Sequence, residues 1–477
     1  MHIGGVLVFE GPPPSLEELV DHIGGRLDRV PRYRQKLAIP PLDSGRPLWI
    51  DDTTFNIAYH VRGTALPAPG TDTQLMELVA RIASQPLDRA KPLWEIYLIE
   101  GIAPEAGGLP EKRFALVFKN HHSLYDGVSG VDLATVLLDL SPEPTLEPAL
   151  DPWHPAPEPS KAQLMLAGLR GTAGATTDLG LRAAAAAVQP DRSFGAFRDV
   201  AEGIGEIVWA ALNPAPATPL NVEIGPHRRY VVIRQQLADY KFVKNTLGGT
   251  VNDVILSVVS GALAKWLPAR RVPTAGLELR ALVPVSVRVK TEHNTFGNQL
   301  TLMRGPLPVY VDDPVARLAV VRVAMDGLKE SKQALGAATI AAMNDLAPPA
   351  VLAQASRMQF STRLFNLLVT NVPGPQFPLY VLGRRLLDMF PLAFLPKNHA
   401  LAVAIMSYDG RIEYGLLGDY DALPDIGLIA DGIESSLAEL VEAAHSVGAD
   451  RPAKPMPEPS AGANGDDPAS VPKDLSQ

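Results

Sequence analysis

The feature that most constrains the fold is an alternation of short apolar runs with capped helical patterns, which occurs in two stretches of the chain. In the first stretch, Ile3 to Phe9 is a strand-like run, and Ser15 to Glu18 form a capping box ahead of a helix expected at about 16–24. A second helical pattern covers Asp72 to Ser84 and precedes the buried strand Phe114 to Phe118. This alternation predicts an α/β fold.

The second stretch repeats the alternation. The strand Tyr230 to Ile233 is followed by helices at about 237–246 and 251–266, with a break at Gly248-Gly249 between them. The remaining elements are strands at Leu279 to Val289 and Phe365 to Thr370, a hairpin of Leu401 to Ser407 with Ile412 to Leu417 turned by Asp409-Gly410, and a last helix at about 425–446.

Between the two stretches, residues 141–221 are rich in proline at both ends and form an Ala-rich helical pattern around Leu164 to Val188. We therefore divide the chain into an N-terminal subdomain (1–145), a helical linker (146–222), a C-terminal subdomain (223–449) and a tail (450–477). The tail contains too few large apolar residues to offset the entropy of ordering, so we expect it to be disordered.

Composition excludes several classes of partner and site. The 477 residues include 43 Lys and Arg against 52 Asp and Glu, and the resulting net charge of −9 argues, local patches aside, against nucleic acid or an anionic bilayer as the main partner. The absence of cysteine excludes thiolate nucleophiles and cysteine-ligated metals. The most apolar stretch, Val254 to Leu263, is about half the ~20 residues that a spanning helix needs, and the N-terminus has no secretory signal pattern. We expect a cytoplasmic protein that lies on membranes if it contacts them at all.

One polar segment, Lys119 to Gly127, stands between a buried strand and an apolar helix expected at Val128 to Leu140. A histidine there can accept a hydroxyl proton, because much of an unperturbed imidazole is neutral at physiological pH. The alternatives are two surface histidines, with Asp126 capping the following helix and Gly127 serving the turn. A metal site is disfavoured, because His121 and His122 are adjacent and no helical HExxH is present.

The four residues His121, His122, Asp126 and Gly127 match the HHxxxDG signature of the CoA-dependent acyltransferase superfamily. Within it, the chain resembles bacterial wax ester synthase/diacylglycerol acyltransferases. That resemblance rests on further motifs in the expected order, namely Pro31 to Gln35, Tyr59 to Arg62, Pro92-Leu93-Trp94-Glu95, Gly225 to Arg228, Val251 to Val254, Phe296-Gly297-Asn298 and Thr370 to Pro375.

The resemblance implies two chloramphenicol-acetyltransferase-like domains, each a mixed sheet with helices, joined by a helical crossover and enclosing a tunnel. It also implies direct acyl transfer from acyl-CoA to diacylglycerol, or to a long-chain alcohol, with no metal or organic cofactor. His122 would be the general base, and His121 would support the loop. Asp126 would pair with an arginine, for which Arg288 is our candidate; ordinary surface exposure of Arg288 is the alternative.

A tetrahedral oxyanion also needs hydrogen-bond donors. The candidates for these donors or for contacts to the acceptor are Asn252, Asn298, Thr370 and Asn371. Helix capping by Asn252-Asp253 and a turn at Asn371 are the structural alternatives. Trp94 is expected to pack in the core or at the domain interface.

Two rival functions remain open at this point, a carrier-protein-dependent condensation-type acyltransferase and a catalytically inactive lipid-binding homologue. Adjacent carrier or adenylation modules would favour the first rival, and the chain contains no such signal. Without a spanning helix, the enzyme would reach lipid through peripheral contact with the inner membrane face or with lipid inclusions. The linker helix, with Leu164, Met165, Leu166 and Leu169 near Lys161 and Arg170, could lie in that interface or pack on the second domain.

Overall fold

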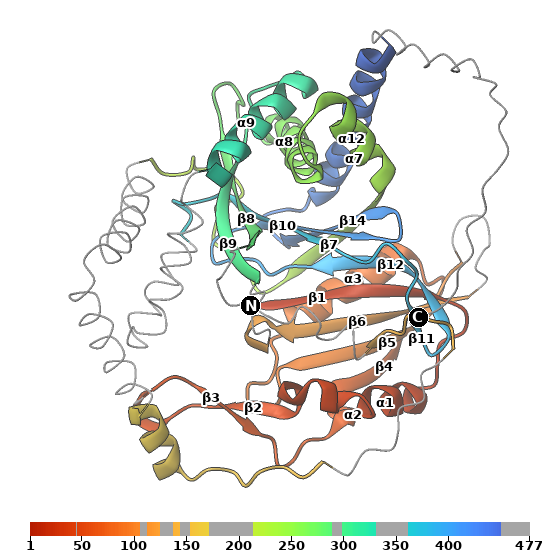
Figure 1. Ribbon diagram of the computed structural model, residues 1–477, viewed down its shortest axis with the longest axis vertical. Coiled ribbons are helices and arrows are strands. Elements are labelled where there is room, and N and C mark those ends of the chain that lie inside the picture. Colours follow the sequence, from red (N-terminus) through yellow and green to blue (C-terminus); the bar gives the residue numbers. More distant parts are fainter. Residues whose placement is uncertain are drawn as a thin grey trace, which may run out of the picture.

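A computed structural model describes residues 1–43, 45–104, 112–124, 137–143, 153–170, 213–288, 298–330 and 361–449. The chain forms two six-stranded mixed sheets, one stacked above the other, and a two-stranded ribbon at one end of the molecule (Figure 1). Helices cover the outer faces of both sheets. The α/β class, with two mixed sheets and helices, is therefore as predicted.

The first sheet has the strand order β11-β12-β1-β6-β5-β4, in which only β4 and β5 are parallel. Its strands are β1 (His2–Glu10), β4 (Val61–Ala65), β5 (Trp94–Ile102), β6 (Arg113–His121), β11 (Tyr380–Val381) and β12 (Arg384–Leu392). Its helices are α1 (Leu16–Gly24), α2 (Ile57–His60) and α3 (Asp72–Ser84), with short 3-10 turns at Leu27–Arg29, Pro31–Arg34, Pro41–Asp43 and His122–Leu124. The ribbon consists of β2 (Gln35–Ala38) and β3 (Leu48–Asp51).

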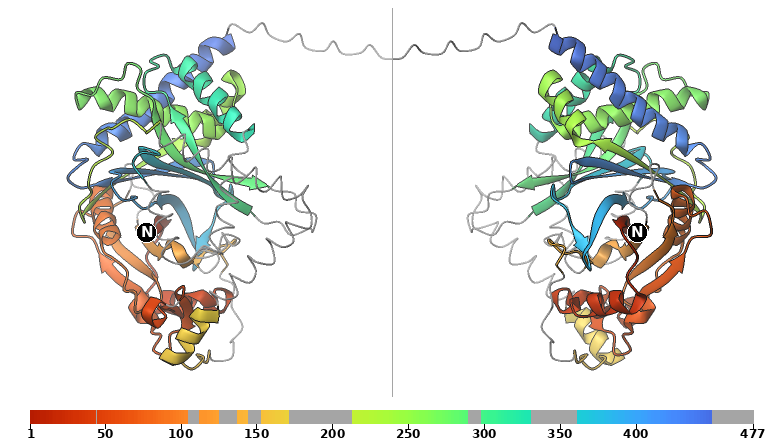
Figure 2. Two further views of the ribbon diagram at one scale, coloured as in Figure 1. Left: turned by 90° about the vertical axis from the view of Figure 1, so that its left-hand side faces the viewer. Right: turned by 90° about the vertical axis from the view of Figure 1, so that its right-hand side faces the viewer.

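The second sheet has the order β7-β14-β13-β10-β8-β9, in which β10 runs parallel to both β13 and β8. Its strands are β7 (Arg228–Gln236), β8 (Leu279–Arg288), β9 (Asn298–Leu307), β10 (Leu367–Pro373), β13 (Leu401–Tyr408) and β14 (Arg411–Asp419). Helices cover its outer face (Figure 2), and in the described part of the chain these are α7 (Leu237–Leu247), α8 (Val251–Ala269), α9 (Pro314–Glu330) and α12 (Ile426–Ala449).

The first sheet buries both of its faces. Along β1, Leu7 and Phe9 point into the cluster that includes α1, whereas Val6 and Val8 point into the cluster that includes α3. The second cluster also contains Tyr230 and Leu417 from the second sheet. Helix α3 therefore fills part of the space between the sheets and joins their cores.

Local signals specify the helices well. Ser15, Thr71 and Thr250 each cap a helix through a complete capping box, and α3 has the predicted bounds. The break between α7 and α8 is also as predicted, because Gly248 and Gly249 both adopt positive φ. The Asp409-Gly410 hairpin turn is confirmed by the pairing of β13 with β14.

Strand β12 crosses the division that the sequence predicts at residue 222. The predicted C-terminal subdomain includes residues 384–392, yet β12 pairs with β1 and lies in the N-terminal sheet. This crossover needs a close backbone approach at Gly5, where a Cβ atom would lie 2.9 Å from the Phe390 carbonyl oxygen. The absence of a side chain at Gly5 therefore allows β12 to pair with β1, although the two strands are far apart in the sequence.

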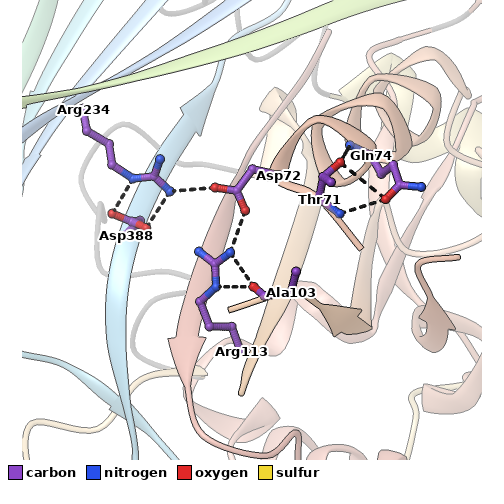
Figure 3. A network of polar contacts seen from close by, with 7 residues as sticks. All are labelled: Thr71, Asp72, Gln74, Ala103, Arg113, Arg234 and Asp388. Atoms are coloured by element: carbon purple, nitrogen blue, oxygen red, sulfur yellow. Dashed lines mark hydrogen bonds and ion pairs between the residues drawn. The ribbon is translucent and has the colours of Figure 1, made fainter. Parts of the chain in front are cut away.

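An ion network ties the two halves together around Asp388 of β12 (Figure 3). Arg234 of β7 donates two hydrogen bonds to the buried Asp388 carboxylate, at 3.0 and 2.9 Å, and Arg411 of β14 donates a third at 2.7 Å. Arg234 also lies 3.6 Å from Asp72 of α3, whose other oxygen accepts a 2.8 Å hydrogen bond from Arg113 of β6. The network therefore links β6, α3, β12, β7 and β14.

The described part of the linker packs on the ribbon. Residues 161–170 are helical, and Gly168 lies so close to Gly45 that a Cβ atom on Gly45 would be 2.4 Å from the Gly168 Cα. The alternative in which this helix packs on the second domain is therefore wrong. Within the described ranges, no single helix is long and apolar enough to cross a membrane; only α7 and α8 together pass that test, and they are bent by 101°.

Candidate functional site

The histidine pair lies where β6 ends. His121 is the last residue of the strand, and His122 begins the 3-10 turn that follows. Both backbones are fixed from neighbouring strands: the His121 amide donates to the Leu93 carbonyl at 2.9 Å, and the His122 amide donates to the Met1 carbonyl at 3.0 Å. The two side chains therefore project from a backbone that is fixed by both neighbours of β6.

The two imidazoles have different environments. The Nδ1 atom of His121 accepts a 3.2 Å hydrogen bond from the Ser123 amide and lies 2.7 Å from the Ser123 hydroxyl, so this nitrogen is engaged in the turn. Burial lowers the pKa of His121 to about 4. Burial also lowers the pKa of His122 below its usual value, and a hydrogen bond with its own backbone offsets part of that effect.

The His122 side chain is exposed at the protein surface, although enough protein surrounds the ring to lower its pKa by desolvation. At neutral pH its imidazole is therefore uncharged and accessible, which is the state that a general base requires. The ring meets Phe394 edge-on, with a centroid distance of 6.2 Å. Phe394 in turn packs against a buried cluster that includes Leu282, Leu368 and Ala402 of the second sheet. His122 thus faces the space between the two halves of the protein.

A buried aromatic cluster of Trp94, Tyr33 and His60 packs beside β6, the strand that ends in the histidines. Trp94, directly opposite Asn120 on the neighbouring strand, is fully buried, and its indole Nε1 donates to the Tyr33 carbonyl at 2.7 Å. His60 stacks on Trp94 at 4.5 Å and donates from Nδ1 to its carbonyl at 2.8 Å. Asn120 donates to the Tyr33 hydroxyl at 3.2 Å. The packing role expected for Trp94 agrees with this burial.

A buried ion pair completes the support. Lys119 Nζ lies 2.8 Å from the Glu95 carboxylate and donates to the carbonyls of Ile82 and Gln85, both at 3.2 Å. Arg62 approaches the other Glu95 oxygen at 3.2 Å. The ammonium group of Lys119 thus uses all three of its donors inside the protein.

Three of the sequence motifs that led to the resemblance therefore meet in three dimensions. Residues 31–35, 59–62 and 92–95 each contribute a contact to the β5–β6 pair that ends in the histidines. Sequence reasoning quoted these motifs without assigning Tyr33, His60, Glu95 or Lys119 a role. It missed Phe394 entirely, since no motif surrounds that residue.

Two of the predicted oxyanion donors, Thr370 and Asn371, lie on opposite faces of the second sheet. Along β10, Leu367 and Val369 point toward the outer helices, whereas Leu368 packs with Phe394 on the inner face. Because strand side chains alternate, Thr370 shares the inner face, and Asn371 shares the outer one. Asn252 lies in the first turn of α8 on the outer side. Its proposed capping alternative is wrong for Asn252 itself, because Thr250 and Asp253 form the cap.

Arg288 and Asn298 are paired directly across the β8–β9 hairpin, and their side chains lie outside the described part of the structure. Both the backbone and the side chains of Asp126 and Gly127 lie outside it. The helix predicted at 128–140 also falls mostly outside. Its predicted end at Leu140 is wrong, because Asp139 instead forms a β-bridge with Tyr380. Arg26 holds this point through a buried 2.5 Å ion pair to Asp139.

Among the described residues, no three His, Asp or Glu side chains lie close enough to hold a metal ion. A surface cavity of about 430 Å³ is lined by residues that include Glu223, Arg270 and Asp421. Its lining includes none of the predicted site residues. The tunnel implied by the resemblance therefore stays a prediction.

Comparison with known proteins gives two matching family models. Residues 1–255 match the wax ester synthase/diacylglycerol acyltransferase catalytic domain, and residues 296–441 match the C-terminal domain of the same family. A probable diacylglycerol O-acyltransferase of Mycobacterium tuberculosis is 33% identical over 441 residues, which cover 92% of this chain and 91% of the relative. A second such protein from that organism is 31% identical over 455 residues, covering 93% of this chain and 95% of the relative.

Solved structures agree with these matches. The wax ester synthase/diacylglycerol acyltransferase of Marinobacter aquaeolei VT8 superposes with a TM-score of 0.65 and 27% identity, covering 93% of this chain and 95% of that one. The first condensation domain of the CDA synthetase gives a TM-score of 0.53 at 15% identity, with 93% and 90% coverage. At that identity the condensation domain shows a shared two-domain fold and nothing about activity.

Proposed function

The chain belongs to the wax ester synthase/diacylglycerol acyltransferase family, and from that premise we propose that it transfers a long-chain acyl group from acyl-CoA to diacylglycerol, forming triacylglycerol. The names of the mycobacterial relatives support diacylglycerol as the acceptor. Long-chain alcohols, which would give wax esters, are a second acceptor class that the family model includes.

One observation carries the proposal. His122 is an accessible imidazole with a lowered pKa, and it stands on a rigid strand end facing the second sheet. A base in this position is neutral at physiological pH, so it needs no activation by a second residue before it accepts a proton. His121, with one ring nitrogen engaged by Ser123, is left to support the turn.

In the proposed reaction, His122 removes the proton of the acceptor hydroxyl as its oxygen attacks the thioester carbonyl. The new C–O bond gives a tetrahedral oxyanion, which collapses as the C–S bond breaks. The departing CoA thiolate takes the proton from the imidazolium. Free CoA and the ester leave, His122 returns to its neutral form, and no acyl-enzyme or cofactor is involved.

We assign stabilisation of the oxyanion to Thr370 ahead of Asn252 and Asn371, because Thr370 lies on the same face of the second sheet as the cluster that Phe394 packs against, and Phe394 meets the His122 ring. For Asp126 we retain the proposed pairing with Arg288. Asn298, directly opposite Arg288 across the hairpin, would then support the same loop instead of contacting substrate.

Acceptor esterification by the wild-type protein tests this proposal. Palmitoyl-CoA is supplied with either dioctanoylglycerol or hexadecanol in detergent, and the lipid products are resolved by chromatography. We expect triacylglycerol from the first acceptor, and wax ester from the second would extend the acceptor range. If neither acceptor yields ester from acyl-CoA while an acyl group linked to a carrier protein is transferred, the acyl-CoA assignment is wrong.

A further inference from the structure

The helix at 161–170 presents its apolar face outward. Ala162, Met165, Leu166 and Leu169 follow the i, i+3, i+4, i+7 spacing of a single helical stripe, and all four are exposed. Leu166 and Leu169 expose 47% and 49% of their surface. A helix on a globular protein normally turns such a stripe toward the core. Here the buried position is Gly168, on the side of the helix that touches the ribbon.

This orientation is specified by contacts on the protein side of the helix. Ser160 caps the helix in a reciprocal pair with Gln163, at 2.8 and 3.3 Å. The preceding segment is fixed to the ribbon by an ion pair of Glu158 with Lys36 at 3.3 Å and by the Ala156 amide, which donates to Asp51 at 2.9 Å. The outward stripe is therefore a property of a helix that is held in place.

The connection between β2 and β3 adds two more apolar side chains at the same end of the molecule. Ile39 is 65% exposed and Leu42 is 91% exposed. Figure 1 shows the helix, coloured gold, beside β3 at the end of the protein farthest from the helices of the second sheet. We call these exposed apolar side chains at one end of the molecule, Ile39, Leu42, Met165, Leu166 and Leu169, the aliphatic edge.

Two cations flank the apolar stripe of the helix at 161–170. Lys161 and Arg170 stand at the two ends of the exposed helix, and neither has an ion-pair partner among the described residues. Of the acidic groups beside this helix, Glu158 pairs with Lys36, and Asp51 accepts a hydrogen bond from the Ala156 amide. Lys161 and Arg170 thus place two cations beside the apolar stripe of a protein whose overall net charge of −9 would otherwise repel an anionic surface.

We propose that the aliphatic edge is a docking surface for an anionic phospholipid bilayer, with its apolar side chains inserted among the acyl chains and with Lys161 and Arg170 contacting lipid phosphates. The inference rests on the proposed function in one respect, because diacylglycerol resides in membranes and an enzyme without a described spanning helix must reach it from the surface.

Vesicle co-sedimentation of the full chain, without acyl-CoA or diacylglycerol, tests the docking surface. The probes are vesicles of phosphatidylcholine with an equal part of phosphatidylglycerol, and vesicles of phosphatidylcholine alone. We expect binding to the anionic vesicles, and at least tenfold weaker partitioning for the double variant Leu166→Ser/Leu169→Ser, because two apolar side chains no longer transfer from water into the acyl chains. Lys161→Gln/Arg170→Gln should weaken binding to anionic vesicles severalfold and leave binding to neutral vesicles unchanged.

The matched control is Val323→Ser/Leu428→Ser, which removes two apolar side chains that are at least as exposed, from α9 and α12 on the second domain. It should bind vesicles as the wild type does. Equal loss in both double variants, or unchanged binding after Leu166→Ser/Leu169→Ser, overturns the docking surface. Preference for neutral vesicles does the same.

The docking surface and the proposed function fail in different ways. A wild-type protein that esterifies dioctanoylglycerol in detergent but ignores anionic vesicles refutes the docking surface alone. A wild-type protein that binds the vesicles through Leu166 and Leu169, yet forms no ester in detergent, refutes the proposed function alone.

Discussion

Replacing Lys119 by methionine would break the buried ion pair beneath the histidine strand while nearly preserving side-chain volume. Lys119 is buried, and its ammonium group contacts the Glu95 carboxylate at 2.8 Å and two carbonyl oxygens at 3.2 Å. The variant would leave Glu95, itself buried, with Arg62 at 3.2 Å as its remaining charged partner.

Removal of one member of a buried pair costs about 3–5 kcal/mol, because the other charge stays desolvated. Arg62 still offsets part of that cost, so we expect Lys119→Met to lower the free energy of unfolding by about 3 kcal/mol. Glu95→Gln should cost a similar amount, since it leaves the ammonium group buried. The double variant Glu95→Gln/Lys119→Met removes both charges and should be at least about 2 kcal/mol less destabilised than the sum of the two single changes.

Urea unfolding followed by tryptophan fluorescence and by circular dichroism measures these three values. The double-mutant cycle isolates the pair from the packing of the two side chains. Additive single changes, or a cost below about 1 kcal/mol for Lys119→Met, would show that the pair is weakly coupled and that the physical account of this support is wrong.

Three further predictions follow from the described contacts. The free energy of unfolding should fall between pH 7.5 and pH 5, because burial lowers the pKa of His60 to about 4 while the unfolded imidazole titrates near 6.5. Protonation of the unfolded chain then removes about 2 kcal/mol of stability at pH 5. In chemical denaturation, His60→Gln should lose this pH-dependent part of the stability, whereas the control His154→Gln, at an exposed histidine, should keep it. Asp388→Asn should destabilise the protein by about 2 kcal/mol, since two arginines lose a charged acceptor, and an unchanged denaturation midpoint would contradict this role for the network. The pH profile of kcat/KM should be flat above pH 7 and fall only below pH 6.5, because burial lowers the pKa of His122; an acidic limb centred above pH 7 would exclude His122 as the titrating base.

The helices and the histidine loop were accessible to sequence analysis because their signals are local. The α3 bounds follow from a capping box at Thr71 and an apolar face at helical spacing, both contained within fourteen residues. The hairpin at Asp409-Gly410 and the break at Gly248-Gly249 depend on backbone conformations that a residue pair specifies by itself.

Strands β5 and β12 were missed because their buried faces carry charges. Glu95 interrupts the apolar pattern of β5, and Asp388 interrupts that of β12. Each carboxylate is buried only because partners from other strands reach it, Lys119 in the first case and Arg234 in the second. Such pairs are long-range in sequence, so no local pattern predicts them.

The candidate site likewise combines residues that a local motif predicts with residues whose placement depends on long-range packing. The motif identified His122 directly, whereas the separation of Thr370 from Asn371 required knowledge of which face of β10 meets Phe394. A linker helix that could lie in a lipid interface was predicted around Leu164 to Leu169, but the direction of its apolar stripe depends on the contact of Gly168 with Gly45. The roles of Asp126 and Arg288 remain predictions from the resemblance.

Release of free thiol from palmitoyl-CoA in the presence of dioctanoylglycerol tests the central claim most directly, with wild type, His122→Ala and the exposed-histidine control His154→Ala compared after each is shown to be folded. General-base catalysis contributes about 10²–10⁴-fold, so we expect His122→Ala to lose at least about a hundredfold in kcat, and His154→Ala to retain wild-type activity. Equal activity of His122→Ala and wild type would show that His122 is not the base and would contradict the account.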